Sequence, residues 1–334
     1  MITGAIFRDA VISASNNINN NKKEVNALNV FPVPDGDTGT NMAMTMAAAA
    51  REVAHIDDFA PVSVVASAAA NALLRGARGN SGVILSLIFR GIAKGLKGCQ
   101  QANGANMAAA LMLGVDSAYK AVMKPTEGTI LTVVRIAAQD ATEMALDTDI
   151  RFAQVWEEVC KSAKETLDKT PSMLPVLKKA GVVDAGGQGL VCIFEGMRSV
   201  FVDDIMIESE DDGVSSQQET VIKTAVVDAD IEFGYCTEFL VDKPDDKEQD
   251  ATRLRAYLES IGDCVVVVDD DEIIKVHVHS NEPGSAIQEG LKFGALMNIK
   301  IENMRQQHQN AVWGAAQDVE QNIPLEKAEP ENVY

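Results

Sequence analysis

The feature that most constrains the fold of this chain is a change of hydrophobic pattern near residue 200. Before it, the sequence is rich in Ala, Met and Leu, poor in aromatic residues, and free of alternating strand patterns. The apolar spacing and the Gly, Pro, Asn and Asp of the connections predict helices near 2–21, 40–54, 61–75, 80–97, 105–122, 127–145, 152–168, 171–180 and 187–201. We therefore expect an all-helical bundle or barrel over residues 1–202.

The second half has a different character. Residues 203–220 are acidic and polar, which is typical of a linker. A domain of residues 221–318 follows, with strands predicted near 221–230, 234–242, 263–269, 272–280 and 297–303, and helices near 248–261, 284–293 and 304–317. Its last four strands and the two helices between them follow the order β-α-β-β-α-β, which indicates an α+β ferredoxin-like sandwich. A polar tail, residues 319–334, ends the chain.

Composition excludes several classes of partner. The net charge of −20 argues against nucleic acid and anionic membrane surfaces, because both would repel the protein. The five cysteines are scattered and form no disulfide framework, which fits a reducing cytoplasm. No apolar run reaches the roughly 18 residues that a membrane span needs. We expect a cytoplasmic protein without stable membrane insertion.

Two carboxylates two residues apart, Asp35 and Asp37, lie in the segment NVFPVPDGDTGTNM, residues 29–42. Pro32 and Pro34 stiffen this loop, and an apolar helix is expected to begin near Thr40. Rigidly held oxygen ligands suit Mg²⁺, which fills its shell with water and phosphate oxygens. The start of the helix offers N–H groups to an anion. The segment predicts a magnesium–nucleotide site, with an ordinary Asp/Gly turn as the alternative.

Three further glycine turns precede helices: GARGNSG at 76–82, EGT at 127–129 and DAGGQG at 184–189. Each presents backbone N–H groups, and Ser81 and Thr129 add hydroxyls that suit phosphate or ribose oxygens. Taken singly, each is equally explained as a packing turn, a helix cap or a plain loop. If a barrel brings all four segments to one rim, they would enclose a nucleotide.

In order, the four segments resemble the blocks of the L-type nucleotide-binding domain of dihydroxyacetone kinases. With the second domain included, they resemble more closely the catalytic subunit of bacterial fatty acid kinases. The resemblance implies an eight-helix antiparallel barrel that binds ATP or ADP with two Mg²⁺. It identifies Asp35, Asp37 and Thr38 as the catalytic loop, with Asp35, Asp37 and Asn29 as Mg²⁺ ligands. The nucleotide-binding residues that it implies are Thr40, Asn41, Asn80, Ser81, Gly82, Thr129, Asp184, Gly186 and Gly187.

This chain departs from the dihydroxyacetone enzymes at two positions of the first segment. It has Asn29 near the place of an upstream Asp, and Thr38 where they carry His. The family of fatty acid kinases phosphorylates a carboxylate that is already ionised, so no general base is needed, and the lack of His in these segments fits that acceptor.

The resemblance therefore implies ATP-dependent transfer to a fatty acid held by a separate fatty-acid-binding protein, giving an acyl phosphate for phospholipid synthesis. That family has a further C-terminal domain, so we expect weak or no transfer from a chain ending at Tyr334. The alternatives are a kinase acting on a small hydroxyketone, and a non-enzymatic nucleotide-binding or dimerisation module. Under any of these interpretations the chain could form a homodimer.

The second domain contains its own cluster of candidate ligands. His277 and His279 are two residues apart and project from one face of a predicted strand, while Cys236 lies on another. If those strands are neighbours, the three side chains could hold Zn²⁺, with water, Glu238 or another chain in the fourth position. The alternative is two surface histidines and a buried cysteine.

The middle domain of the fatty acid kinases has this Cys and His-x-His pattern, which implies zinc. The expected distance between this Cys–His cluster and the acidic loop favours a structural role for the metal. Packing roles are expected for the other four cysteines, which are Cys99, Cys160, Cys192 and Cys264.

Overall fold

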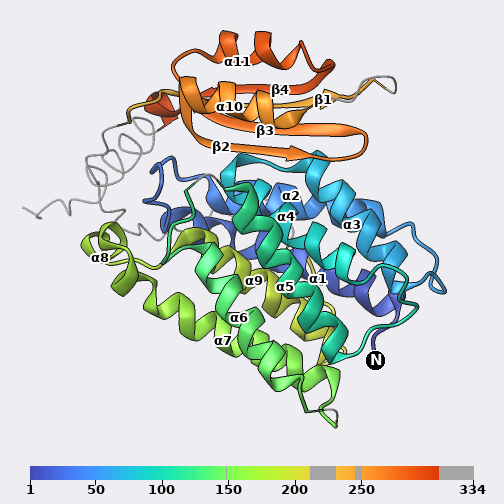
Figure 1. Cartoon of the computed structure of the whole chain (residues 1–334). Helices are drawn as coiled ribbons and strands as arrows, with labels where there is room; N and C mark the ends of the chain where they lie inside the picture. Colours follow the sequence, from blue (N-terminus) through green and yellow to red (C-terminus); the bar gives the residue numbers. More distant parts are fainter. Residues whose placement is uncertain (123, 148, 211–230, 245–249, 308–334) are drawn as a thin grey trace, which may run out of the picture.

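A computed structural model describes residues 1–122, 124–147, 149–210, 231–244 and 250–307. A helical domain carries a small sheet domain on one side, and two helices cover the sheet face that points away from it (Figure 1). Within the residues that the structure describes, no helix is both long and apolar enough to cross a membrane.

The helical domain is a closed ring. In the described part of the chain its helices are α1 (Gly4–Ala27), α2 (Thr38–Val53), α3 (Val62–Gly76), α4 (Gly79–Gly95), α5 (Gly104–Ala121), α6 (Ile130–Met144), α7 (Phe152–Met173), α8 (Pro175–Ala180) and α9 (Ala185–Phe201). Each of α1 to α7 packs against the next, and α9 contacts both α7 and α1. Small side chains, many of them alanines, fill the buried faces, which lets the helices approach closely. The prediction of an all-helical first domain is confirmed.

The predicted helix break at Pro171 is wrong. Helix α7 continues through this residue to Met173, and the break comes just before α8. Proline has no N–H to give to the carbonyl of Leu167, four residues earlier. The Thr170 hydroxyl donates to that carbonyl oxygen instead, at 2.7 Å, so the helix keeps its bonding. The same hydroxyl oxygen accepts the backbone N–H of Asp184 at 3.1 Å, which ties the end of α7 to the start of α9.

The second domain is a four-stranded antiparallel sheet in the order β2-β3-β1-β4. Its elements are β1 (Tyr235–Asp242), α10 (Ala251–Ile261), β2 (Gly262–Asp269), β3 (Ile273–Ser280), α11 (Pro283–Gly290) and β4 (Ala295–Asn303). This is the expected β-α-β-β-α-β order. Residues 304–307 are helical, and the rest of the helix expected at 304–317 lies outside the described residues. So do the strand expected at 221–230, the tail at 319–334 and residues 211–220 of the acidic segment.

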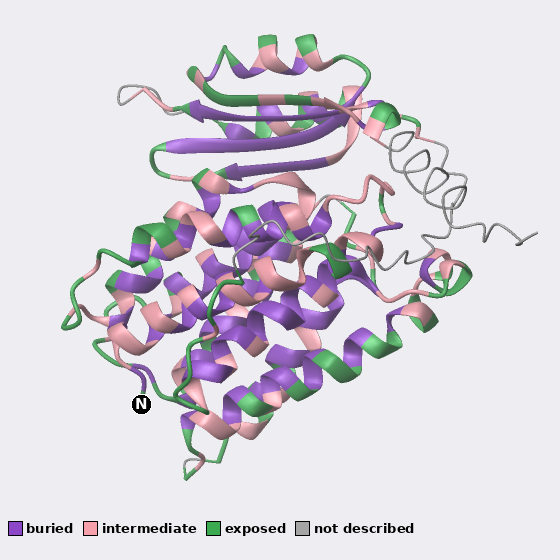
Figure 2. Cartoon of the chain, turned by 180° about the vertical axis from the view of Figure 1, so that it is seen from behind, coloured by how far each residue is buried: buried purple, intermediate pink, exposed green. Residues whose placement is uncertain are grey.

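The two faces of the sheet are both covered. Residues such as Phe239, Val276 and Val278 pack against α10 and α11 and form a separate small core. Leu240 and Val266 point the other way and join the core of the helical domain. Every residue of β3 is buried as a result, and Figure 2 shows burial along the middle strands of the sheet.

Polar contacts fix the sheet on the helices. The Lys275 ammonium group, on β3, donates to the carbonyl oxygen of Ala77 at 3.0 Å. Burial lowers the pKa of this lysine. At the turn after β2, Asp270 accepts from Arg90 at 2.9 Å, which adds an ion pair to the interface. These contacts place β3 over the turn between α3 and α4.

Residues 203–210 turn back along the first helix. The backbone N–H of Ile207 donates to the Ser13 hydroxyl at 3.1 Å, and its carbonyl oxygen accepts from the Asn16 amide at 2.8 Å. The described start of the acidic segment is therefore held against α1.

We predict that Gly114→Ala destabilises the chain by about 1–3 kcal/mol, because α4 and α5 touch through their backbones at this point. A Cβ at Gly114 would lie 2.7 Å from the Ile88 carbonyl oxygen. Alanine favours helix more than glycine does, so any loss reports this close contact. Urea unfolding measures the change. The control is Gly284→Ala, where an added Cβ has no neighbour within 4 Å. Equal midpoints for both variants would contradict the packing argument.

Candidate active site

A small cavity of about 30 Å³ lies where the two domains meet. By volume it admits about two water-sized species. The acidic loop and the first turns of α2 and α4 form one side, and the polar face of the sheet forms the other. Its polar lining residues include Asn29, Asp35, Asp37, Thr38, Asn41, Asn80, Ser81, Cys236, His277, His279, Lys300 and Glu302.

The two carboxylates of the acidic loop are crowded together. Burial, followed by the charge of Asp37, raises the pKa of Asp35 well above its ordinary value. The Asn29 amide donates to an Asp35 oxygen at 2.5 Å and is itself buried. Asp37 precedes α2 but makes no side-chain cap to it. Crowded carboxylates with an amide beside them suit a hard divalent cation, which would remove the cost of placing two negative charges side by side.

Asn80 offers a second sign that something polar binds here. Its side-chain oxygen is buried and has no hydrogen-bond partner among the described residues. A buried acceptor without a partner costs free energy, so a ligand that donates to it or coordinates it would be favoured. Asn80 follows Gly79, the first residue of α4, and Ser81 comes next. Both side chains line the small cavity and a larger one beside it.

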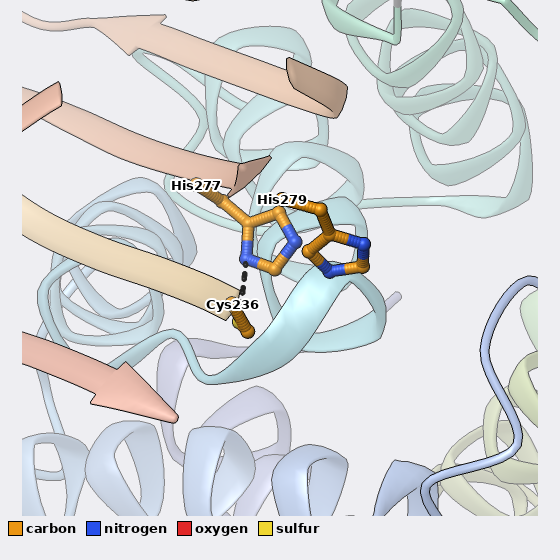
Figure 3. Close-up of side chains that lie close together, drawn as sticks. All are labelled: Cys236, His277 and His279. Atoms are coloured by element: carbon orange, nitrogen blue, oxygen red, sulfur yellow. Dashed lines mark hydrogen bonds between the residues drawn. The ribbon is translucent and has the colours of Figure 1, made fainter. Parts of the chain in front are cut away.

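Cys236, His277 and His279 form the cluster drawn in Figure 3. Their ligand atoms lie within 4.8 Å of one another, and the two imidazole rings are 5.0 Å apart. The Cys236 sulfur is 3.9 Å from Nδ1 of His277, and a Glu238 oxygen is 2.9 Å from the same nitrogen. Nε2 of His277 is buried with no hydrogen-bond partner among the described residues. This donor set and spacing fit Zn²⁺, with the carboxylate of Glu238 orienting a ligand.

The electrostatics of this cluster also suit a metal. Burial, and then the neighbouring His277, lower the pKa of His279 to about 3, so its imidazole is neutral. Burial opposes ionisation of Glu238, but its bond to His277 brings the pKa of this carboxyl down to about 2. A neutral imidazole such as that of His279 is the form that binds metal, and the buried Glu238 carboxylate would compensate the charge of a bound cation.

The expectation that this cluster lies far from the acidic loop is wrong. Cys236, His277 and His279 line the same small cavity as Asp35 and Asp37. The β1–β3 register sets Cys236 opposite His279, and the domain contact turns that face toward the loop. Sequence distance concealed this proximity, because only the docking of the two domains creates it.

Cys264 is not the packing residue that we expected. It lies in a bulge of β2 between Asp263 and Val266, with φ at +50°. Its sulfur, an Asp263 oxygen and a His279 nitrogen are within 4.8 Å of one another. Cys160 and Cys192 are buried in the helical core, and Cys99 packs against it, as expected.

A larger cavity of about 250 Å³ adjoins the first, and all four predicted segments contribute to its lining, the acidic segment through Phe31 and Pro32. Predicted residues in its lining are Asn80, Ser81, Thr129, Asp184 and Gly186. Apolar side chains supply much of the remaining wall, from Ile84, Val122, Ile130, Leu131 and Val266. Sequence reasoning missed the residues of β2 because nothing local to that strand indicates what lies opposite.

Three predicted residues lie outside these two cavities. A Cβ at Gly82 would overlap the Thr45 hydroxyl, so this glycine permits close packing of α4 on α2. The N–H of Gly187 donates to the Asp184 carboxylate at 2.7 Å and caps α9. Thr40 bonds to Asn26 through both its backbone N–H and its hydroxyl, at 3.1 and 3.0 Å.

Each of the two domains matches a known protein family. Residues 32–199 match the family model of the DAK2 domain. The chain belongs to the DAK2-domain family. Residues 232–311 match the family model of the fatty acid kinase A-subunit-like middle domain. The two matches follow the two domains of the structure.

Longer relatives cover the chain almost completely. Protein YloV of Bacillus subtilis is 42% identical over 333 residues, which are 98% of this chain and 60% of that protein. Uncharacterized protein SH1689 of Staphylococcus haemolyticus is 41% identical over 316 residues, 93% of this chain and 57% of the relative. The chain thus spans about three fifths of the length of these relatives. The dihydroxyacetone kinase of C. freundii, solved with AMP-PNP and Mg²⁺, overlaps 57% of this chain and 33% of its own, at 19% identity and a TM-score of 0.44.

The Asp184 carboxyl gives a prediction about pH. Burial raises its pKa to about 6, although N–H groups of Gly187 and Ile130 partly oppose the shift. The folded state therefore holds this proton more tightly than the unfolded state does. Without metal or nucleotide, we expect the wild type to lose stability relative to Asp184→Asn as pH rises from about 4 to about 6. The loss is on the order of 3 kcal/mol, and the difference is constant above that range.

Urea unfolding of both proteins across this pH range measures the effect. Because Asn can still accept the Gly187 N–H, the cap is kept in the variant. A stability difference that does not change with pH would show that the carboxyl titrates normally.

Proposed function

We propose that this chain binds ATP with Mg²⁺ and transfers the γ-phosphoryl group to a fatty acid carboxylate. The observation that carries the proposal is the junction of the two cavities. An apolar-walled cavity at the starts of α4, α6 and α9 shares the lining residues Pro32, Asn80 and Ser81 with a smaller one that has crowded carboxylates. Such a pair fits a nucleoside with its phosphates directed at metal ions.

Each part of the nucleotide has candidate contacts. Ile84, Leu131 and Val266 would contact the base, and the first turns of the three helices would face the phosphates. Asn80, Ser81, Thr129, Asp184 and Gly186 would provide polar contacts, with Thr38 and Asn41 beside the metals. Two Mg²⁺ ions held by Asp35, Asp37 and Asn29 would neutralise the charge that develops during transfer.

A carboxylate acceptor suits the side chains present. Forming an acyl phosphate requires one carboxylate oxygen to bond to the γ-phosphorus while the bond to the β–γ bridging oxygen breaks. ADP leaves with that electron pair, and no proton is transferred. Of the described histidines, His277 and His279 reach the small cavity, and both belong to the cluster with Cys236. The family description of the middle domain supports a fatty acid as the acceptor.

We further propose one Zn²⁺ at Cys236, His277 and His279. Bound zinc would add positive charge to the cavity that Asp35 and Asp37 share. The residues themselves hold the site in place, because Glu238 fixes the ring of His277 and β1 pairs with β3. The zinc would therefore act within the active site rather than only support the sheet.

The proposal includes architecture and partners. We propose that the ring is the eight-helix antiparallel barrel, with α8 as an addition, and that the second domain is a ferredoxin-like sandwich. The domains would divide near residue 202, with a linker to 220, and the middle domain would end near 318.

A separate fatty-acid-binding protein would deliver the acid in the cytoplasm. The description of the matched family, which names a subunit of a kinase, supports such a partner. A homodimer is also proposed.

The nucleotide site is tested by Asp35→Ala combined with Asp37→Ala. We expect MgATP affinity to fall at least about tenfold, because the metal would lose its charged ligands. Calorimetric titration with MgATP, and with ATP plus a chelator, measures it. Asp116→Ala, at an exposed position of α5, is the matched control. If the double variant bound MgATP as tightly as the wild type, the site would be elsewhere and the kinase proposal would fail.

The zinc site is tested by metal analysis of the purified chain. The wild type should hold about one zinc ion, and Cys236→Ala should lose most of it, because two imidazoles alone bind weakly. Cys99→Ala, a cysteine packed on the helical core, should retain it. Equal zinc contents in the two variants would exclude Cys236 as a ligand.

A further inference from the structure

His279 belongs to two groups of metal-binding side chains. One is the cluster with Cys236 and His277 described above. The other consists of Asp263, Cys264 and His279, whose ligand atoms also lie within 4.8 Å of one another. Figure 3 shows one ring nitrogen of His279 directed away from Cys236 and His277. An imidazole has two distinct ring nitrogens, so His279 can serve a different partner with each.

The pairing of β2 with β3 creates the second group. Asp263 lies opposite His279 across the two strands, so the two side chains leave the sheet on the same face. Cys264 lies in the bulge that follows, and its φ of +50° takes its side chain out of the usual alternation. Two consecutive residues of β2 therefore both reach a nitrogen of His279.

The spacing of these donors suits a metal ion better than a hydrogen bond. An Asp263 oxygen is 3.7 Å from Nδ1 of His279, which is too long for a hydrogen bond. Two ligands of one tetrahedral zinc ion lie about 3.3–3.6 Å apart, because Zn–N and Zn–O bonds are about 2.1 Å long and Zn–S bonds about 2.3 Å. In the first group, the Cys236 sulfur and Nδ1 of His277 have a similar spacing of 3.9 Å.

The two groups open onto different cavities. Asp263 and Cys264 line the larger cavity, whereas Cys236, His277 and His279 line the small one. An ion held by the second group would therefore face the larger cavity, where water can complete its coordination. Half of the Asp263 side chain is exposed, so an ion can reach these donors from solvent.

We propose that Asp263, Cys264 and His279 form a second metal site, which takes a divalent ion such as Zn²⁺ or Co²⁺ and faces the larger cavity. The site goes beyond the proposed kinase function and does not depend on it. With both sites filled, the ring of His279 would bridge the two ions, each nitrogen bound to one of them. Bridging requires the ring to release its N–H proton to solvent, and the Cys264 thiol must release its proton as well.

The second site should be the weaker of the two. In place of one imidazole of the first group it has the carboxylate of Asp263, which suits zinc less well. An ion at the first site also draws electron density from the ring that the two sites share. We therefore expect the purified chain to carry one zinc ion, at Cys236, His277 and His279, and the second site to fill when further metal is added.

Cobalt titration of the zinc-loaded chain tests the second site. Zn²⁺ has a filled d shell and absorbs no visible light, and Co²⁺ binds such ligands more weakly, so cobalt should leave the zinc in place. We expect one further equivalent of Co²⁺ to bind, with the intense near-ultraviolet absorption of a cobalt–thiolate bond. Metal analysis should show that the zinc is retained. Wild type that binds no cobalt, or that releases one zinc for each cobalt bound, would overturn the inference.

Cys264→Ser identifies the thiolate. It should weaken cobalt binding at least about tenfold and remove the thiolate absorption, because a serine hydroxyl is a poor ligand for these ions. Cys99→Ala, at a cysteine packed against the helical core, should keep both. The two variants should retain the first zinc ion. If Cys264→Ser kept the thiolate absorption, the cobalt would be bound elsewhere and the inference would be wrong.

Asp263→Asn tests the site without changing the bulge residue. A neutral amide is a weaker ligand than a carboxylate, so cobalt affinity should again fall about tenfold. The matched control is Asp269→Asn at the other end of β2, where Asp269 pairs with Lys243 at 2.9 Å. Equal cobalt affinities in these two variants would exclude Asp263 as a ligand and overturn the site. That result would leave the kinase proposal intact, because MgATP binding tests it separately.

Discussion

The buried polar face of β3 determines how the rest of the molecule is arranged. Lys275 and His277 are almost completely excluded from water, and a buried polar group without a partner costs several kcal/mol. The Ala77 carbonyl oxygen and Glu238 supply partners for these two side chains. The partner of Lys275 lies on the helical domain, so this hydrogen bond favours the observed docking of the sheet. That position puts the Cys–His cluster against the acidic loop.

Local sequence patterns predicted most of the elements. The helical period of the first half and the alternation of the second identified every described helix and strand, with differences mainly at their ends. The error at Pro171 came from treating proline as a break, whereas the Thr170 hydroxyl replaces the missing donor. Cys264 was misjudged because a bulge reverses the direction of a strand residue, and no alternation pattern reports it.

For the candidate site too, the sequence predicts some residues and not others. Asn80, Thr129 and Asp184 could be predicted from their turns, because a helix start exposes N–H groups whatever the tertiary structure. The contact between the acidic loop and the Cys–His cluster could not be predicted, since residues about 200 positions apart in the sequence meet only when the domains dock.

Docking of the two domains also brings positively charged side chains together. The domain interface contains three cationic side chains, Arg78, Lys275 and Lys300. They attract an anionic ligand locally, although the whole chain has a net charge of −20 and would repel it.

The wall that β2 contributes to the larger cavity has a thermodynamic consequence. Val266 faces that space from the sheet domain, and Thr129 and Asp184 face it from the helical domain. A ligand that fills the cavity touches both domains at once, so its binding free energy is also free energy of domain association. The coupling is reciprocal. If loss of the Lys275–Ala77 hydrogen bond makes domain association less favourable, it lowers the affinity for a ligand that needs both domains in place. A ligand in this cavity therefore strengthens the association of the two domains, and the domains separate more easily when the cavity is empty.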